Sequence, residues 1–140
     1  MKTQYTSLVK IKKTHLDKME QAVASCHDTI SIVKKKIEDA YNELSSLEIP
    51  QEGDFSLFRQ MQDLKHRVTE EIGFNKYNLQ LAENALLKAM QQLKTANIEH
   101  EKFKYLETTE IEKVLKAQKL KEAKDLDEVA LMMFNRKNND

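Results

Sequence analysis

The chain has 140 residues, no net charge at neutral pH and 33% charged side chains, but only two glycines and one proline. Because turns consume glycine and proline, this composition excludes a β-rich or loop-rich fold. Aromatic residues make up 6% of the chain and tryptophan is absent, which argues against a thick globular core. The 23 basic and 23 acidic residues balance, so no general preference for polyanions follows. The composition is typical of an extended, all-α protein.

The first residues, MKTQYTSLVKIKK, are basic but lead into no continuous apolar stretch, so we expect no secretory signal. No run approaches the ~20 apolar residues of a membrane span. A single cysteine, Cys26, excludes an intramolecular disulfide and fits a reducing compartment. These features predict a cytoplasmic protein.

The spacing of apolar residues predicts a first long helix over about residues 3–48. Alternate steps of four and three reach Tyr5, Val9, Lys12, Leu16, Met19, Val23, Cys26, Ile30, Val33, Ile37, Ala40, Leu44 and Leu47. All of these residues are apolar or aromatic except Lys12. A stripe that repeats every 3.5 residues faces a partner helix continuously when the two helices supercoil left-handedly.

The next stretch, SSLEIPQEGD, predicts a turn at about residues 49–54. Pro50 disfavours helix at Ile49, and Asp54 can cap the start of a new helix. A short connection makes two long helices antiparallel neighbours.

A second helix is predicted over about residues 55–137. Its stripe consists of Leu57, Met61, Leu64, Val68, Ile72, Asn75, Leu79, Ala82, Leu86, Ala89, Leu93, Ala96, His100 and Phe103. Val68 and Ile72 follow Leu64 by two successive steps of four, a stutter that locally unwinds the supercoil. With Gly73 beside it, the stutter predicts a bend or soft point. Asn75 at a core position is expected to fix the register.

The second helix is expected to extend beyond the first. The next steps after Phe103 fall on Glu107 and Glu110, so the regular repeat fades, but residues 104–137 contain no proline or glycine. This segment predicts an overhang of ~50 Å at 1.5 Å per residue. Its apolar residues, which we expect the hairpin to leave uncovered, are Leu106, Ile111, Val114, Leu115, Leu120, Leu126, Val129, Leu131, Met132, Met133 and Phe134. Such exposed residues indicate a partner site, the alternative being a tail that frays or self-associates.

No pattern in the sequence predicts catalysis, a cofactor or a metal. The four histidines form no metal-ligand spacing, and His100-Glu101 lacks a second histidine at position 104. Cys26 lies on the core stripe, where it acts as a small hydrophobe. The lysines between Lys113 and Lys124 are interpreted as a solvated face, and three arginines give little support for nucleic-acid binding.

The chain's length, its two unequal antiparallel helices and its C-terminal KEAKDLDEVALMMFNRK resemble the FliJ flagellar export protein family and the related YscO proteins of type III secretion. The residues that carry the resemblance are Glu122, Lys124, Asp127, Glu128 and Ala130. The resemblance implies a stalk protein similar in fold to the gamma subunit of rotary ATPases. It also implies a site at the cytoplasmic face of the flagellar export apparatus, peripheral to the membrane.

The resemblance further implies that the terminal end enters a hexameric, FliI-like export ATPase ring. The residues expected to bind the ring are Leu126, Val129, Leu131, Met132, Met133 and Phe134. The hairpin tip would meet the export gate protein FlhA. The tip residues, chosen by position, are Tyr41, Leu44, Phe55, Phe58 and Met61. A FliH-like ATPase regulator and export chaperones are further implied partners.

Two other functions stay open at this point. One is a generic dimerising cytoplasmic coiled-coil adaptor or export chaperone, in which the overhang pairs with its own copy. The other is a nucleic-acid-associated coiled coil that uses the basic end of the hairpin. Sedimentation discriminates the first from a largely monomeric stalk, and salt-dependent DNA binding discriminates the second.

Overall fold

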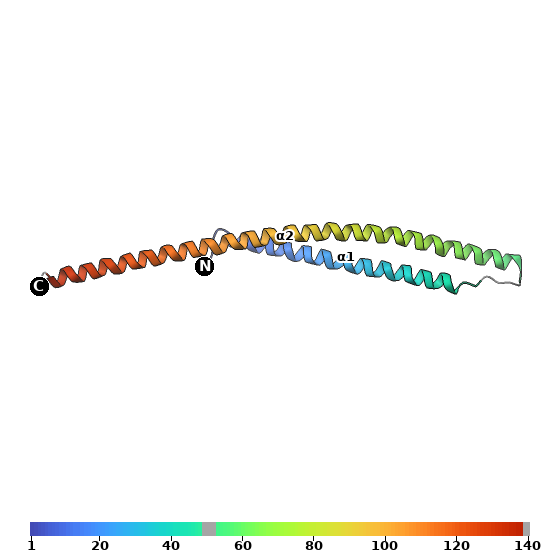
Figure 1. Cartoon of the computed structure of the whole chain (residues 1–140), viewed down its shortest axis with the longest axis horizontal. Helices are drawn as coiled ribbons and strands as arrows, with labels where there is room; N and C mark the ends of the chain where they lie inside the picture. Colours follow the sequence, from blue (N-terminus) through green and yellow to red (C-terminus); the bar gives the residue numbers. More distant parts are fainter. Residues whose placement is uncertain (49–52, 139–140) are drawn as a thin grey trace. The chain divides into compact units, whose positions relative to one another are not determined.

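A computed structural model describes residues 1–48 and 53–138, which form two helices, α1 (Thr6–Ser46) and α2 (Phe55–Asn138) (Figure 1). The described residues contain no strand, and the predicted all-α helical hairpin is confirmed. Both helices begin and end within a few residues of the predicted limits. Of the predicted turn, residues 49–52 lie outside the described residues.

The contacts within the chain define two compact units. The hairpin unit is Leu16–Thr95, and the terminal unit combines Met1–His15 with Ala96–Asp140. Each helix runs from one unit into the other, because the unit limits fall inside α1 and α2. The predicted organisation as a single coiled-coil domain stays a prediction.

In the hairpin unit, α1 and α2 lie side by side and antiparallel (Figure 1). Ala40 near the end of α1 packs with Val68 and Ile72 near the start of α2. Leu44, Leu47 and Leu64 pack against this cluster. Every stripe residue predicted for this unit is buried or half-buried except Leu57, which is exposed. The 3.5-residue repeat therefore identifies the seam, because only that period keeps one face of each helix on its neighbour.

Hydrogen bonds between residues close in sequence lie at the start of each helix. At the first helix, the Thr3 amide donates to Thr6 Oγ1 at 2.8 Å, and the Tyr5 amide donates to Thr3 Oγ1 at 3.1 Å. At the second, the Ser56 amide donates to Asp54 Oδ1 at 3.5 Å, so the predicted cap is confirmed. Gly53 precedes it with φ of +144°, a conformation that residues with a Cβ rarely adopt.

The stutter in α2 is accommodated without an interruption of the helix. Val68 and Ile72 are both buried, with exposures of 3% and 6%. Asn75, three residues after Ile72, is also buried, with an exposure of 7%. Two steps of four therefore keep both apolar residues in the seam. Gly73 lies on the exposed side of α2, and the helix continues through it. The predicted soft point stays a prediction.

Neither α1 nor α2 has a stretch that is long and apolar enough to span a bilayer, within the residues described. This finding agrees with the charge carried along both helices.

Candidate partner-binding surfaces

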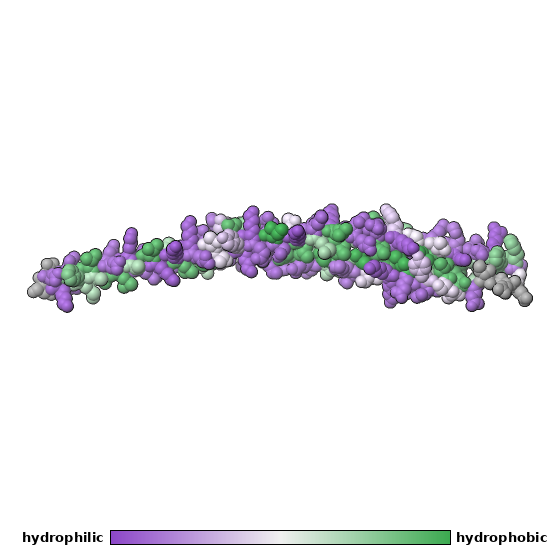
Figure 2. All heavy atoms as spheres, in the orientation of Figure 1, coloured by the Kyte–Doolittle hydropathy of each residue, from purple (hydrophilic) through white to green (hydrophobic). Residues whose placement is uncertain are grey.

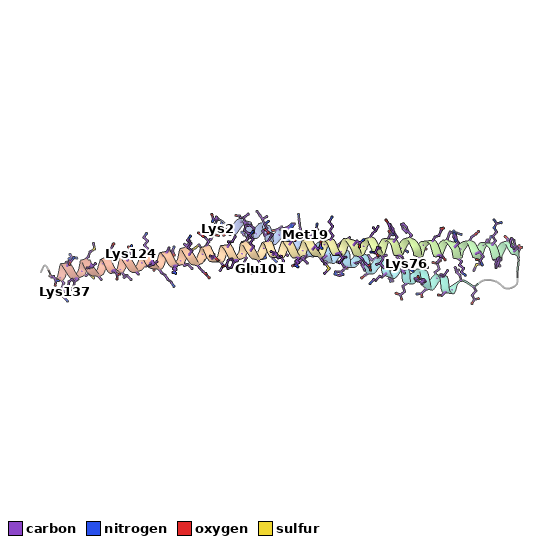
Figure 3. The ribbon with its side chains drawn as sticks, turned by 45° about the horizontal axis from the view of Figure 1, so that its top comes forward. Lys2, Met19, Lys76, Glu101, Lys124 and Lys137 are labelled. Carbon is purple, nitrogen blue, oxygen red and sulfur yellow. The ribbon has the colours of Figure 1, made fainter. Side chains whose placement is uncertain are left out.

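The C-terminal end of α2 is exposed on every side. Partly buried positions in the terminal unit end at Val114, and each residue from Leu115 to Asn138 is exposed. Figure 3 shows Lys124 and Lys137 on this part of α2, with no second helix of the terminal unit beside them. The residues predicted to bind a partner all lie here, with exposures from 50% to 69%: Leu126, Val129, Leu131, Met132, Met133 and Phe134.

The exposed end begins later than the sequence predicted. Leu106, Ile111 and Val114 are half-buried, so the prediction that the hairpin leaves them uncovered is wrong. The chain before α1 reaches further along α2 than expected, and a groove of about 390 Å³ there is lined by Met1–Gln4, Glu110, Val114 and Gln118. These first residues precede α1, so the chain lies beside α2 beyond the point that α1 itself reaches. The uncovered end is therefore about 36 Å long rather than ~50 Å.

Apolar side chains surround the end of α2 instead of forming one stripe. Successive helical residues are rotated by about 100°, so the four consecutive residues Leu131–Phe134 point in four directions around the axis. Figure 2 shows hydrophobic and hydrophilic atoms interspersed along this end. Arg136 and Lys137 follow in the last turn, where positive charge complements the helix dipole. A helical turn with apolar side chains on all sides, such as Leu131–Phe134, is fully buried only when a partner surrounds it.

The predicted gate-binding residues of the hairpin tip differ in their accessibility. Tyr41, Phe55 and Phe58 are exposed, at 42%, 75% and 40%. Leu44 is half-buried because it packs against the core cluster, and Met61 is also half-buried. Their assignment to a partner stays a prediction, and three of the five side chains are free to contact one. The Tyr41 ring has the Lys76 ammonium 5.2 Å from its centroid (Lys76 is labelled in Figure 3).

A further exposed apolar surface on the hairpin unit was missed by the sequence analysis. Phe74, Tyr77 and Leu81 are exposed at 65%, 62% and 49% and lie at positions i, i+3 and i+7 of α2. This spacing places them on one face of the helix, away from the seam residues. Their regular spacing outside the seam stripe was a signal that could have identified them. We call these three residues the outer patch.

Lys12, the exception in the first stripe, is accommodated at the edge of the seam. Its ammonium lies 3.8 Å from Glu99 Oε2 and 5.5 Å from the centroid of the Phe103 ring. The aliphatic stem occupies the seam position while the charge reaches a carboxylate and an aromatic face. The contact is partly solvated, since about a third of each charged side chain is exposed.

The described residues contain no group of three or more ligands able to hold a metal ion. Cys26 is half-buried on the seam beside a small hollow of about 100 Å³, which Ser25, Thr29, Ala82 and Ala85 also line. Small side chains on both helices leave this space. The arrangement fits the predicted role of Cys26 as a packing residue.

The sequence of the chain matches a known protein family. A family model described as flagellar FliJ protein matches residues 1–139. Comparison with curated proteins and with solved structures found no match.

Proposed function

Because the chain belongs to the FliJ family of flagellar proteins, we propose that it is the central stalk of the export apparatus, with its C-terminal end held inside a hexameric, FliI-like export ATPase ring. Membership of this family makes the chain a flagellar export protein, and the family is a non-enzymatic export component. In the proposed role the protein acts at the cytoplasmic face of the apparatus. It reaches the membrane only through that apparatus.

The turn Leu131–Phe134 near the end of α2, with apolar side chains on all sides, carries this proposal. A flat partner, or a second copy lying alongside, would bury one side of Leu131–Phe134 and leave the other side in water. The pore of a ring encloses a helix on its axis and can bury all four side chains. Full burial of such side chains contributes ~1.5–3 kcal/mol each before the costs of association, so the end could supply several kcal/mol.

The second contact of the proposed stalk is made by the hairpin unit with the export gate protein FlhA. The exposed Phe55 and Phe58 at the start of α2, together with Tyr41, provide the accessible part of the predicted surface. Leu44 and Met61 would support it from the partly buried side. A FliH-like regulator and export chaperones complete the proposed set of partners.

The test replaces the side chains of the end while keeping the chain length. In the full chain, Leu131, Met132, Met133 and Phe134 are each changed to serine. We expect binding to the purified export ATPase to weaken at least tenfold and stimulation of its ATP hydrolysis to be lost. Thermal unfolding should be nearly unchanged, because these residues are exposed in the free protein.

The matched control changes Phe74, Tyr77 and Leu81 to serine, which removes a comparable exposed apolar area elsewhere on α2. Its binding to the ATPase should equal that of the natural chain. Normal binding and stimulation by the end variant would refute the stalk proposal. If the end variant instead converts a homodimer to a monomer in sedimentation, the adaptor function is the correct one.

A further inference from the structure

The segment Met1–His15, which we call the strap, covers part of α2 in the terminal unit through a seam that mixes apolar and ionisable residues. Alternate steps of four and three along α2 beyond Phe103 reach Glu107, Glu110 and Val114, and all three are partly buried. The seam repeat therefore continues to Val114, although its residues change character. The ionisable seam residues of this unit are Lys12, His100, Glu107 and Glu110.

Two of these residues have buried atoms without a hydrogen-bond partner. The His100 side chain is 12% exposed, and its Nδ1 lies 3.9 Å from Glu101 Oε1, beyond hydrogen-bonding distance. Glu107 Oε2 is also buried and unpartnered. Within the described part of the chain, both such side-chain atoms lie in the terminal unit. Water would form hydrogen bonds with both atoms if the strap moved away. Burial of these atoms beneath the strap therefore destabilises the packing of the strap on α2.

The strap gains only partial apolar burial in return, because the apolar side chains of α2 beside it are half-buried rather than buried: Phe103, Leu106, Ile111 and Val114. Tyr5 and Val9 are half-buried, whereas Leu8 and Ile11 are exposed. Ala96 is the buried apolar residue of the terminal unit, again among the residues described. The open groove between Met1–Gln4 and α2 further shows that the first residues pack incompletely.

The ion pair between Lys12 of the strap and Glu99 of α2 is partly exposed to solvent. The Lys12 ammonium pairs with Glu99 at 3.8 Å and lies over Phe103, but 32% and 37% of the two charged side chains are accessible. Solvent and salt screen such a pair, and exposed pairs contribute little to stability.

We propose that the strap is a releasable cover, which detaches from α2 while the hairpin unit stays paired. Release lengthens the uncovered part of α2 from residues 115–138 to residues 96–138, or from about 36 Å to about 65 Å. It also exposes the apolar side chains of Phe103, Leu106, Ile111 and Val114. The use of this longer helix inside the ATPase ring rests on the proposed function, whereas release itself does not.

Hydrogen exchange in the full chain tests release. Amides of residues 10–15 should exchange at least about 100-fold faster than amides of residues 30–40, because they open without the hairpin unit. A variant that fills two polar positions of the seam, His100→Leu with Glu107→Leu, should slow exchange in the strap at least tenfold. Exchange of residues 30–40 should not change.

The matched control is Thr108→Leu with Glu112→Leu, which adds two leucines at exposed positions of the same part of α2. Strap exchange in this control should equal that of the natural chain. Equal protection of residues 10–15 and 30–40 in the natural chain would overturn the proposal. An unchanged exchange rate in the filled-seam variant would overturn it as well.

Binding to the export ATPase tests whether the ring uses the longer uncovered helix. The filled-seam variant keeps the whole C-terminal end but holds the strap on α2. If the ring needs the longer helix, this variant should bind the ring about tenfold more weakly than the natural chain. Binding equal to that of the natural chain would refute the lengthening part of the proposal and leave the stalk function intact. The serine variant of Leu131–Phe134 tests that function separately.

Discussion

The two units are built from the same two helices and the same 3.5-residue repeat, but they fill their seams differently. The hairpin unit buries Leu16, Ile30, Val68 and Ile72, and its polar seam position is Asn75. The terminal unit instead places ionisable side chains at its seam: Lys12, His100, Glu107 and Glu110. The repeat determines which residues face the neighbouring helix. The character of those residues determines how firmly the pairing holds.

The uncovered end of α2 shows a third use of the same helix. It has no neighbour within the terminal unit, yet it stays free of glycine and proline. Isolated helices are marginal in water, and opposite charges four residues apart add about 0.2–0.5 kcal/mol per pair. Glu112 and Lys116, Lys121 and Asp125, and Lys124 and Glu128 have this spacing. Local charge pairing therefore supports helix formation where packing is absent.

The largest expected difference between the units comes from removing the same branched side chain from each seam. Ile72→Ala should cost about 2–4 kcal/mol, because Ile72 is buried in the core cluster and leaves a cavity. Ile111→Ala should cost less than about 1 kcal/mol, because Ile111 is half-buried beside a partly open seam. Urea unfolding followed by circular dichroism measures both changes. Equal losses would mean that the two seams are packed equally well.

A smaller effect is expected at the polar seam position of the hairpin unit. Asn75→Leu should raise the free energy of unfolding by about 1–2 kcal/mol, since it replaces a buried amide by an apolar side chain. The same change should weaken register specificity. Spin labels placed on the exposed faces of α1 and α2 should then give a broader distance distribution. A narrow distribution in the variant would show that Asn75 does not set the register.

Most of the seam was predictable from the sequence because one period governs both long helices. The stripe placed every seam residue of α1 correctly, Lys12 included, and it followed α2 through the stutter at Val68 and Ile72. The two-helix fold follows from that stripe and from the turn residues around Pro50. No long-range topology had to be deduced, since the described residues form two consecutive helices.

The sequence-based prediction of the seam failed at positions that continue the repeat but carry charged residues. The acidic Glu107 and Glu110 predict the end of the repeat, but both are half-buried at positions that continue it. The residues before α1 lie beside α2 as far as Val114, and the stripe gives no information on them. The outer patch of Phe74, Tyr77 and Leu81 was missed because it lies off the seam stripe.

A smaller gain in stability is expected at the glycine beside the stutter. Gly73→Ala should add up to ~1 kcal/mol, because alanine favours the helix and a Cβ there meets nothing within 4 Å. The matched control is Gly53→Ala, which should lower stability because Gly53 has φ of +144°. Both are measured by thermal unfolding. A loss of stability in the Gly73 variant would show that the hairpin unit needs a weak point in α2 there.

The smallest effect is expected at the ion pair of the terminal unit. Glu99→Gln should cost no more than about 0.5 kcal/mol, because the contact to Lys12 is 3.8 Å long and about a third of each side chain is in water. In about 1 M salt the difference should vanish, since the screening length falls to ~3 Å. The measurement is strap exchange, which reports this seam directly, in the natural chain and the variant at both salt concentrations. A much larger change that survives high salt would mean that Lys12 holds the strap firmly, and the contrast between the two seams would then be wrong.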